Sequence, residues 1–240
     1  MSSRNDFLAW IERRNGFLVD VRFDPRHHGP KTLDMEGQRY YRFMDYIYIP
    51  KLPHQLSPEE ILAVSDLRLQ LFDYVVDKPL NRLVMSTIVD AVRRQFRTPS
   101  EVPLRVLDFG CGPGFSSALF RDELGQCDLR GVDISPMALE VARKGGLLVD
   151  QVTYGEPLPF AAGDFNVVFA AFVLHFHIEA AMLIEIRRVL DDKGIFVFNL
   201  YNEAPHGLWE SLSRAGFVTS SFAASIPLPG THRVYCALPG

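Results

Sequence analysis

The sequence has few of the features that mark membrane, secreted or metal-binding proteins. Its longest uninterrupted apolar run, Val167–Leu174, is far shorter than the roughly 20 residues needed to cross a bilayer. Charged residues interrupt the first positions, so no secretory signal can be drawn through them. Only 3 cysteines occur, and their odd number and wide spacing favour reduced thiols over disulfides or zinc ligands. His27-His28 is typical of a surface turn. We expect a cytoplasmic protein without a metal site or membrane association.

A surplus of positive charge is also missing. The 25 lysines and arginines are outnumbered by 29 aspartates and glutamates, which gives a formal net charge of -4. Binding to the phosphate backbone of nucleic acids relies on an excess of lysine and arginine. We therefore expect a small-molecule substrate and no nucleic-acid partner, and the sequence leaves the oligomeric state open.

The first hundred residues predict mainly helices. Ser57 and Glu60 form a capping box with Pro58 at the first helical position, which is a strong helix start. A second helix is predicted from about Pro79 to Phe96, because apolar residues recur there at helical spacing. We expect residues 1–103 to form a mainly helical extension that acts as a lid and selects the substrate.

From residue 104 the pattern changes to short β-type runs that alternate with helical stretches. Such alternation is typical of βαβ units and a mostly parallel sheet. The expected strands are 104–109, 127–132, 149–153, 165–173 and 194–200, with a terminal pair at 217–224 and 232–238. Residues 104–240 therefore predict an α/β domain of Rossmann-like architecture, with a seven-stranded sheet covered by helices on both faces.

The strongest motif lies where the first of these strands meets a helix. Gly110, Gly112 and Gly114 allow a sharp turn and let the backbone approach a ligand closely. Their spacing is G-x-G-x-G, and Phe115 stands where the dinucleotide fingerprint G-x-G-x-x-G has its last glycine. The negative charge of Asp108 would oppose a pyrophosphate but suits a cationic ligand.

An acidic residue also ends the next predicted strand. Asp133 lies about 20 residues beyond the glycine loop, where folds of this kind bind ribose hydroxyls. Ser135 and Pro136 then form a helix N-cap and first helical position, which places Asp133 at a strand tip.

These residues resemble the first two motifs of class I S-adenosylmethionine (SAM)-dependent methyltransferases. The resemblance continues in family order through Tyr154–Phe160, Gly163–Val168, Phe172–Phe176 and Glu185–Gly194. Where Tyr154 and Gly155 stand, the family often has an acidic and a small residue, so Glu156 or backbone is expected to replace the usual adenine contact.

The resemblance implies SAM as the cofactor, lying over the glycine loop. It implies a ribose contact at Asp133, adenine contacts near Ile134 and the following loop, and a methionine end toward Asp108 and Ala170. The residues expected to bind the cofactor are Asp108, Gly110, Cys111, Gly112, Gly114, Asp133, Ile134, Glu156, Pro157, Leu158 and Ala170.

Three side chains are candidates for catalysis. His175 follows the fourth predicted strand of the domain at the edge where ligands bind, where it is either a general base or a packing histidine. Tyr40 and Tyr41 belong to the aromatic run 39–48, which either faces the sulfonium through cation-π attraction or packs as an aromatic strand.

The favoured function is methyl transfer to a small-molecule acceptor by in-line displacement at the sulfonium, in which catalysis is mainly alignment in a water-poor pocket. One alternative is an enzyme of the same fold that acts on the aminobutyrate side chain of SAM, by cyclisation or aminocarboxypropyl transfer, and releases methylthioadenosine. Another is a non-catalytic partner protein of the same fold.

Overall fold

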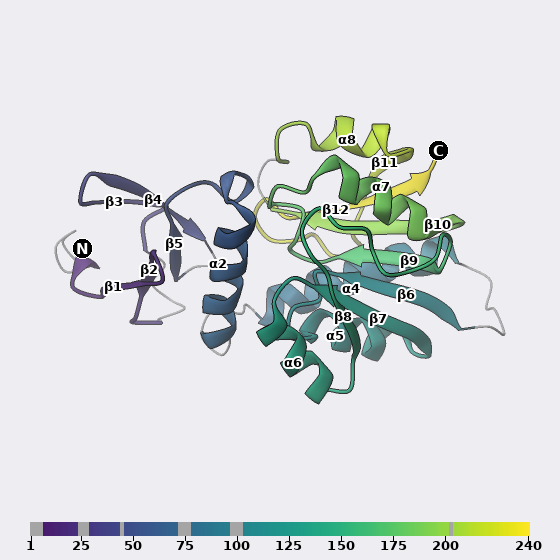
Figure 1. The fold of residues 1–240 in the computed structure, drawn as a ribbon, viewed down its shortest axis with the longest axis horizontal. Coiled ribbons are helices and arrows are strands. Elements are labelled where there is room, and N and C mark those ends of the chain that lie inside the picture. Colours follow the sequence, from purple (N-terminus) through teal and green to yellow (C-terminus); the bar gives the residue numbers. More distant parts are fainter. Residues whose placement is uncertain (1–6, 24–28, 44–45, 72–77, 97–102, 202–203) are drawn as a thin grey trace. The chain divides into compact units, whose positions relative to one another are not determined.

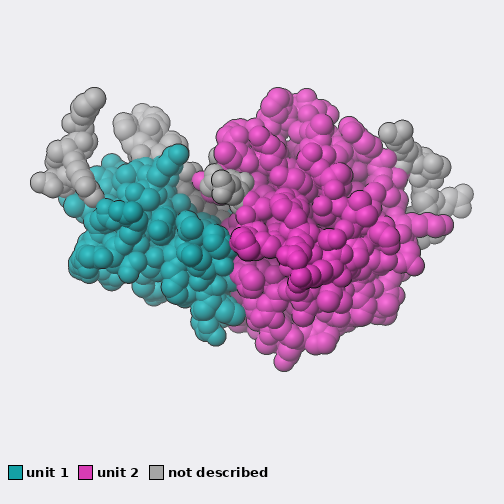
Figure 2. Space-filling view, turned by 90° about the horizontal axis from the view of Figure 1, so that it is seen from above, with its two compact units in different colours: residues 1–77 teal, residues 78–240 magenta. Residues whose placement is uncertain are grey.

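A computed structural model describes residues 7–23, 29–43, 46–71, 78–96, 103–201 and 204–240 (Figure 1). The chain divides into two compact units, Met1–Asp77 and Lys78–Gly240 (Figure 2). His27 and His28 lie outside the described residues. None of the helices in the described ranges is long and apolar enough to span a membrane.

The first unit contains a five-stranded antiparallel sheet, in the order β1-β2-β5-β4-β3. Its strands are β1 Ile11–Arg14, β2 Phe17–Asp20, β3 Thr32–Met35, β4 Gln38–Phe43 and β5 Ile47–Ile49. A small core of Phe7, Leu18, Leu33, Tyr40 and Tyr48 packs against it. The prediction of a mainly helical front segment is therefore wrong for the described residues between 11 and 49, and residues of the aromatic run contribute to β4 and β5.

Two short turns explain why this segment forms strands. Asn15 and Gly16 join β1 to β2, and Glu36 and Gly37 join β3 to β4, with positive φ at all four residues (50°, 82°, 52° and 78°). Two-residue turns with positive φ at both positions match the twist of antiparallel strands, and Asn-Gly is a strong signal for them. The strands that these turns connect are too short to show a long periodic pattern in the sequence.

In the described part of this unit, the sheet is followed by two helices. The short helix η1 (Pro53–Gln55) precedes α2 (Pro58–Gln70). The predicted capping box is confirmed: Ser57 Oγ accepts from Glu60 N at 3.3 Å, and Ser57 N donates to the Glu60 carboxylate at 2.8 Å. Helix α2 buries Ile61 and Val64 among its apolar residues.

The second unit is built on a seven-stranded sheet, in the order β11-β12-β10-β9-β6-β7-β8. The strands are β6 Leu104–Phe109, β7 Cys127–Asp133, β8 Leu148–Gln151, β9 Phe165–Ala170, β10 Leu190–Leu200, β11 Phe217–Phe222 and β12 Arg233–Pro239. The five from β6 to β10 are mutually parallel, and β12 is antiparallel to both β10 and β11. The predicted α/β fold is confirmed, including the terminal strand pair.

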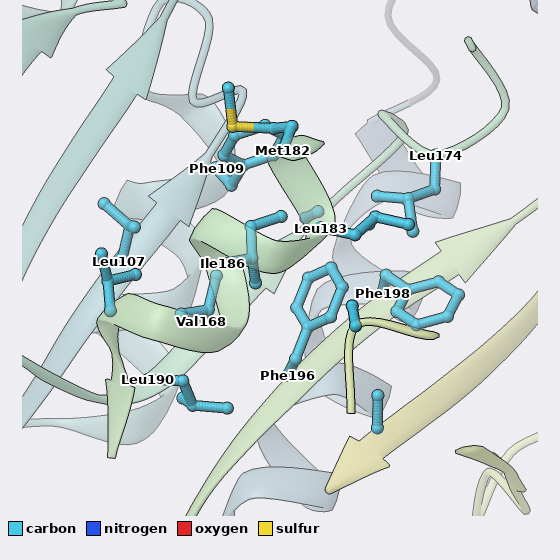
Figure 3. Close-up of a cluster of buried hydrophobic side chains, with 14 of the residues drawn as sticks. Leu107, Phe109, Val168, Leu174, Met182, Leu183, Ile186, Leu190, Phe196 and Phe198 are labelled. Carbon is cyan, nitrogen blue, oxygen red and sulfur yellow. The ribbon is translucent and has the colours of Figure 1, made fainter. Parts of the chain in front are cut away.

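Helices cover both faces of this sheet, as Figure 1 shows. They are α4 Lys78–Gln95, α5 Phe115–Leu124, α6 Pro136–Lys144, α7 Ala180–Val189 and α8 Leu208–Arg214. Successive strand residues point to opposite faces. Phe196 and Phe198 lie in one core with residues of α7, as Figure 3 shows, and with residues of α8. Val197 instead lies in the core with α4, α5 and α6.

Helix α4 belongs to the second unit. Its Val84, Met85, Ile88 and Val92 are fully buried in the same core as Phe169. The two units divide at residue 77, whereas the boundary expected from the sequence, residue 103, lies after this helix. The helix itself matches the predicted one within one residue at each end.

Candidate cofactor site

The glycine loop lies where the strand order of the second sheet reverses. The chain leaves β6 toward β7 on one side and later returns to β9 on the other. In open α/β sheets, ligands bind outside the carboxyl ends of the strands at such a switch point. The fold therefore places residues 110–114 at the expected binding edge.

The three glycines of this loop have different local roles. All have positive φ, of 77° at Gly110, 52° at Gly112 and 85° at Gly114. A β-carbon at Gly110 would lie 2.5 Å from Val173 Cγ2, so this glycine makes room for a side chain of the protein. A β-carbon at Gly112 would meet no described atom within 4 Å. Gly112 is therefore the position with open space for a ligand, and Gly114 is the N-cap of α5.

Asp133 joins the tip of β7 to the glycine loop. Gly112 N donates to one carboxylate oxygen of Asp133 and Ser135 N to the other, both at 2.8 Å. Ser135 Oγ in turn accepts from Ala138 N at 3.0 Å, which confirms the predicted N-cap of α6. These two contacts fix the carboxylate at the tip of β7, which is where folds of this kind bind ribose hydroxyls.

Asp108 is a buried acid beneath this loop. Its side chain is 0% exposed, and Ser117 Oγ donates to its Oδ2 at 2.6 Å. Within the described part of the chain, its Oδ1 has no hydrogen-bond partner. Burial raises the pKa of Asp108 to about 7, opposed by the Ser117 hydrogen bond and reinforced by the charge of Asp133. A buried acceptor without a partner fits a cationic ligand, as the sequence predicted.

Cys111 contributes to the loop through packing and backbone. Its N donates to Val132 O at 2.9 Å, and a β-carbon at Gly131 would lie only 2.7 Å from its Sγ. Burial raises the pKa of this thiol, so the side chain stays neutral. Cys111, Cys127 and Cys236 are all free.

The segment expected to hold the adenine starts beside Asp133. Val152 N donates to Asp133 O at 3.1 Å, directly after β8. Glu156 and Pro157 are exposed and Leu158 is buried, while Ile134 is half-buried against the same core as Leu158. Ile134 and Leu158 therefore pack in one core, and the bond of Val152 holds the start of this segment beside Asp133.

Two charged residues of α7 hold this segment, and neither was predicted from the sequence to have this role. Arg188 donates to Leu158 O at 3.0 Å and to Phe160 O at 2.7 Å. Glu185 accepts from Leu158 N at 2.9 Å and pairs with Arg188 at 2.6 Å. Arg188 is the main cause of the lowered pKa of Glu185. The spacing of three between these opposite charges was the available signal.

Tyr154 connects the same segment to the chain that follows β9. Its hydroxyl donates to the backbone oxygen of His177. Burial raises the pKa of this phenol, and the charge of Glu179 adds to the effect. Tyr154 thus bridges the segment after β8 and the segment after β9.

The end of β9 carries two further predicted residues. Ala170 is fully buried at the last position of the strand. His175 is 7% exposed and its ring centroid lies 4.3 Å from that of Phe176. This packing agrees with the structural interpretation of His175, and its role as a general base stays a prediction.

The other two catalytic candidates, Tyr40 and Tyr41, belong to β4 of the first unit. Tyr40 is 4% exposed within the core of that unit, and its hydroxyl accepts from Arg13 Nη1 at 3.0 Å. Tyr41 is half-buried. A catalytic role for either tyrosine stays a prediction.

Comparison with known proteins agrees with this geometry. Residues 107–198 match a family described as a methyltransferase domain. The chain is 34% identical over 105 residues to a malonyl-[acyl-carrier protein] O-methyltransferase of Legionella pneumophila, covering 40% of this chain and 36% of that protein. It is 30% identical over 154 residues to a ribosomal protein L11 methyltransferase of Burkholderia thailandensis, covering 64% and 43%. The chain thus spans less than half the length of these relatives.

The fold is shared with a solved TehB-like SAM-dependent methyltransferase from Corynebacterium glutamicum. That structure aligns with a TM-score of 0.52 at 17% identity, covering 74% of this chain and 99% of the other. The matched residues contain the glycine loop, Asp133 and β9. The second unit therefore contains a class I SAM-dependent methyltransferase domain, and its cofactor is S-adenosylmethionine.

Proposed function

We propose that this protein transfers the methyl group of SAM to a small-molecule acceptor. The observation that carries the proposal is the bond between Gly112, the glycine with open space, and Asp133 at the neighbouring strand tip. This pair offers a backbone surface for the cofactor and acceptor oxygens for its ribose. The net charge of -4 favours a small acceptor over a nucleic acid.

The residues of the site would act mainly by alignment. Bound SAM supplies an electrophilic methyl group that a lone pair of the acceptor attacks while the carbon–sulfur bond breaks and S-adenosylhomocysteine leaves. Asp133 would hold the ribose, Leu158 would line the adenine site, and the buried carboxyl of Asp108 would face the cationic end. By fixing the cofactor in a water-poor pocket, these residues would let the acceptor approach the methyl carbon in line with the departing sulfur. His175 is the candidate that would take the proton of the acceptor.

The first unit is proposed to select the acceptor, which is the role expected from the sequence for residues 1–103. Between consecutive elements of the second unit the longest connection is residues 152–164, the segment expected to hold the adenine, so the domain itself offers little additional structure for substrate choice. Deleting residues 1–50 should leave the affinity for S-adenosylhomocysteine unchanged but abolish turnover. Unchanged turnover would refute the selecting role.

Mass spectrometry of the nucleosides formed from SAM tests the reaction type. The full chain is incubated with SAM alone and then with a low-molecular-weight filtrate of source-cell extract, with Asp133→Ala as the control variant. S-adenosylhomocysteine that forms only with the filtrate and the intact protein supports methyl transfer. Methylthioadenosine that forms with SAM alone would instead establish chemistry on the aminobutyrate side chain.

The acceptor class needs a separate measurement, because the names of the relatives include both a ribosomal protein and an acyl carrier protein. Whole source-cell extract is incubated with the protein and SAM labelled in its methyl group, then separated by size. Label in the small-molecule fraction supports the proposal. Label confined to the macromolecular fraction would overturn the small-molecule acceptor.

A further inference from the structure

Asn199 is a buried amide near the carboxyl end of β10. Its side chain is 1% exposed, and its Oδ1 accepts from Phe172 N at 2.6 Å. Among the described residues, no partner lies within hydrogen-bonding distance of its Nδ2. A buried polar group with an unpaired donor costs free energy that an aliphatic side chain would not. Packing of the sheet therefore does not explain why an amide side chain occupies this buried position, whereas the hydrogen bond to Phe172 N does.

Phe172 adopts an unusual backbone conformation directly after β9. Its φ is 61°, in the left-handed region that bulky residues rarely enter. Such a residue persists only where its surroundings hold it. Its N–H points to Asn199 on the neighbouring strand, so the amide supplies a hydrogen bond at the residue where the chain turns.

The turn at Phe172 determines where the next side chain lies. Val173 packs against the glycine loop, with its Cγ2 in the space that a β-carbon of Gly110 would occupy. Gly110 N also donates to Val132 O at 2.8 Å, which links the loop to β7. A continuous series of contacts therefore runs from Asn199 through Phe172 and Val173 to Gly110.

We propose that Asn199 is a positioning residue for SAM binding. Its amide holds the turn at Phe172, and this turn places Val173 where it packs against the glycine loop. This role rests on the proposed function, since the loop is taken to bind the cofactor. Loss of the amide leaves the Phe172 N–H buried without a partner. The turn then opens in a fraction of molecules, and the apparent affinity falls in proportion to the fraction that stays competent.

Isothermal titration of the full chain with S-adenosylhomocysteine tests this role. Asn199→Leu keeps the approximate size of the side chain and is expected to weaken binding about tenfold or more. The matched control is Asn166→Leu at the other end of the neighbouring strand, where Oδ1 also accepts a backbone N–H, that of Arg105, at 3.1 Å. The control should bind within about twofold of the parent protein. Equal binding by folded Asn199→Leu would overturn the proposal.

A second variant separates positioning from a general loss of stability. Phe172→Gly removes the strain, because glycine takes positive φ freely, so the turn no longer needs the hydrogen bond of Asn199 to hold it. In the Phe172→Gly background, adding Asn199→Leu should therefore change the affinity by less than about threefold. If Asn199→Leu weakens binding as much in this background as in the parent protein, the positioning role is contradicted. The same holds if the protein with both substitutions folds but binds no better than Asn199→Leu alone. A parent protein that does not bind S-adenosylhomocysteine would instead refute the proposed function.

Discussion

At the scale of single residues, Asp108 should make the stability of the protein depend on pH. Its pKa of about 7 in the folded protein lies above its usual 3.8, with burial as the main cause. Between about pH 4 and pH 7 the folded chain therefore holds more of this proton than the unfolded chain. The contribution of Asp108 to the free energy of unfolding should fall as pH rises through this range, by up to about 4 kcal/mol.

Urea unfolding at several pH values measures this effect. Asp108→Asn keeps an acceptor for Ser117 and cannot titrate, so the slope between about pH 4 and pH 7 should be smaller in this variant. Bound SAM should also reduce the slope in the parent protein, because a nearby positive charge lowers the pKa of a carboxyl. Identical slopes for the parent and Asp108→Asn would show that this carboxyl does not titrate in the stated range.

Asp133 should affect both stability and cofactor binding. Asp133→Ala removes the acceptor for Gly112 N and for Ser135 N, which should lower the free energy of unfolding by about 1–3 kcal/mol. Binding of S-adenosylhomocysteine should weaken by at least about tenfold, because the ribose contact is also lost. Asp128→Ala changes an exposed acid of the same strand and should have little effect on either quantity. Comparable losses in the two variants would argue against a ribose site at Asp133.

The residues of the site differed in how well the sequence could predict them. Asp108, the three glycines and Asp133 lie in short local motifs, and the structure brings them together at one edge. Asn199 is far from Phe172 along the chain, and only the pairing of β9 with β10 brings them together. The role of Gly110 could not be predicted either, because the side chain that would meet its β-carbon is that of Val173, which is distant in the sequence. Contacts between distant strands leave no local pattern.

At the scale of elements, helix α7 should fix the backbone of residues 152–160, the segment expected to hold the adenine. Arg188→Met would remove the donors to Leu158 O and Phe160 O and leave Glu185 without its ion-pair partner. The affinity for S-adenosylhomocysteine should fall about tenfold, since the segment loses the bonds that fix its backbone.

The adjacent arginine provides the matched control for this prediction. Arg187 is also half-buried, but it bonds to Leu190 O and to the exposed Asp192 instead. Arg187→Met should therefore leave the affinity within about twofold of the parent. Titration calorimetry of both variants decides the matter: similar losses, or none for Arg188→Met, would exclude a specific role of the α7 contacts.

Helix starts and strand runs were predictable where their signals are local. The caps at Ser57 and Ser135 and the extent of α4 follow from residues next to one another. The strands of the first unit were missed because each has only 3 to 6 residues, and the turn after β1 was overlooked. Pairing between these strands, rather than the periodicity of any one of them, defines the sheet.

At the scale of the whole molecule, α4 decides where the second unit begins. Its buried face packs against α5, β10 and β12, so removing the helix would expose apolar surface on that helix and on two strands of the sheet. Fully burying one large apolar side chain stabilises a protein by about 1.5–3 kcal/mol. Four such residues of α4 (Val84, Met85, Ile88, Val92) together approach the whole stability of a typical domain, about 5–15 kcal/mol.

Two fragments of the chain test whether α4 is part of the core of the second unit. The fragment 78–240 contains α4 and should unfold cooperatively on heating and bind S-adenosylhomocysteine with nearly the affinity of the full chain. The fragment 104–240 begins at the boundary expected from the sequence, lacks α4, and should fail to unfold cooperatively or bind. Circular dichroism on heating, followed by calorimetric titration, measures both properties. If 104–240 folds and binds as well as 78–240, then α4 is not part of the domain core. If 78–240 fails as well, then the cofactor domain depends on the first unit for its stability.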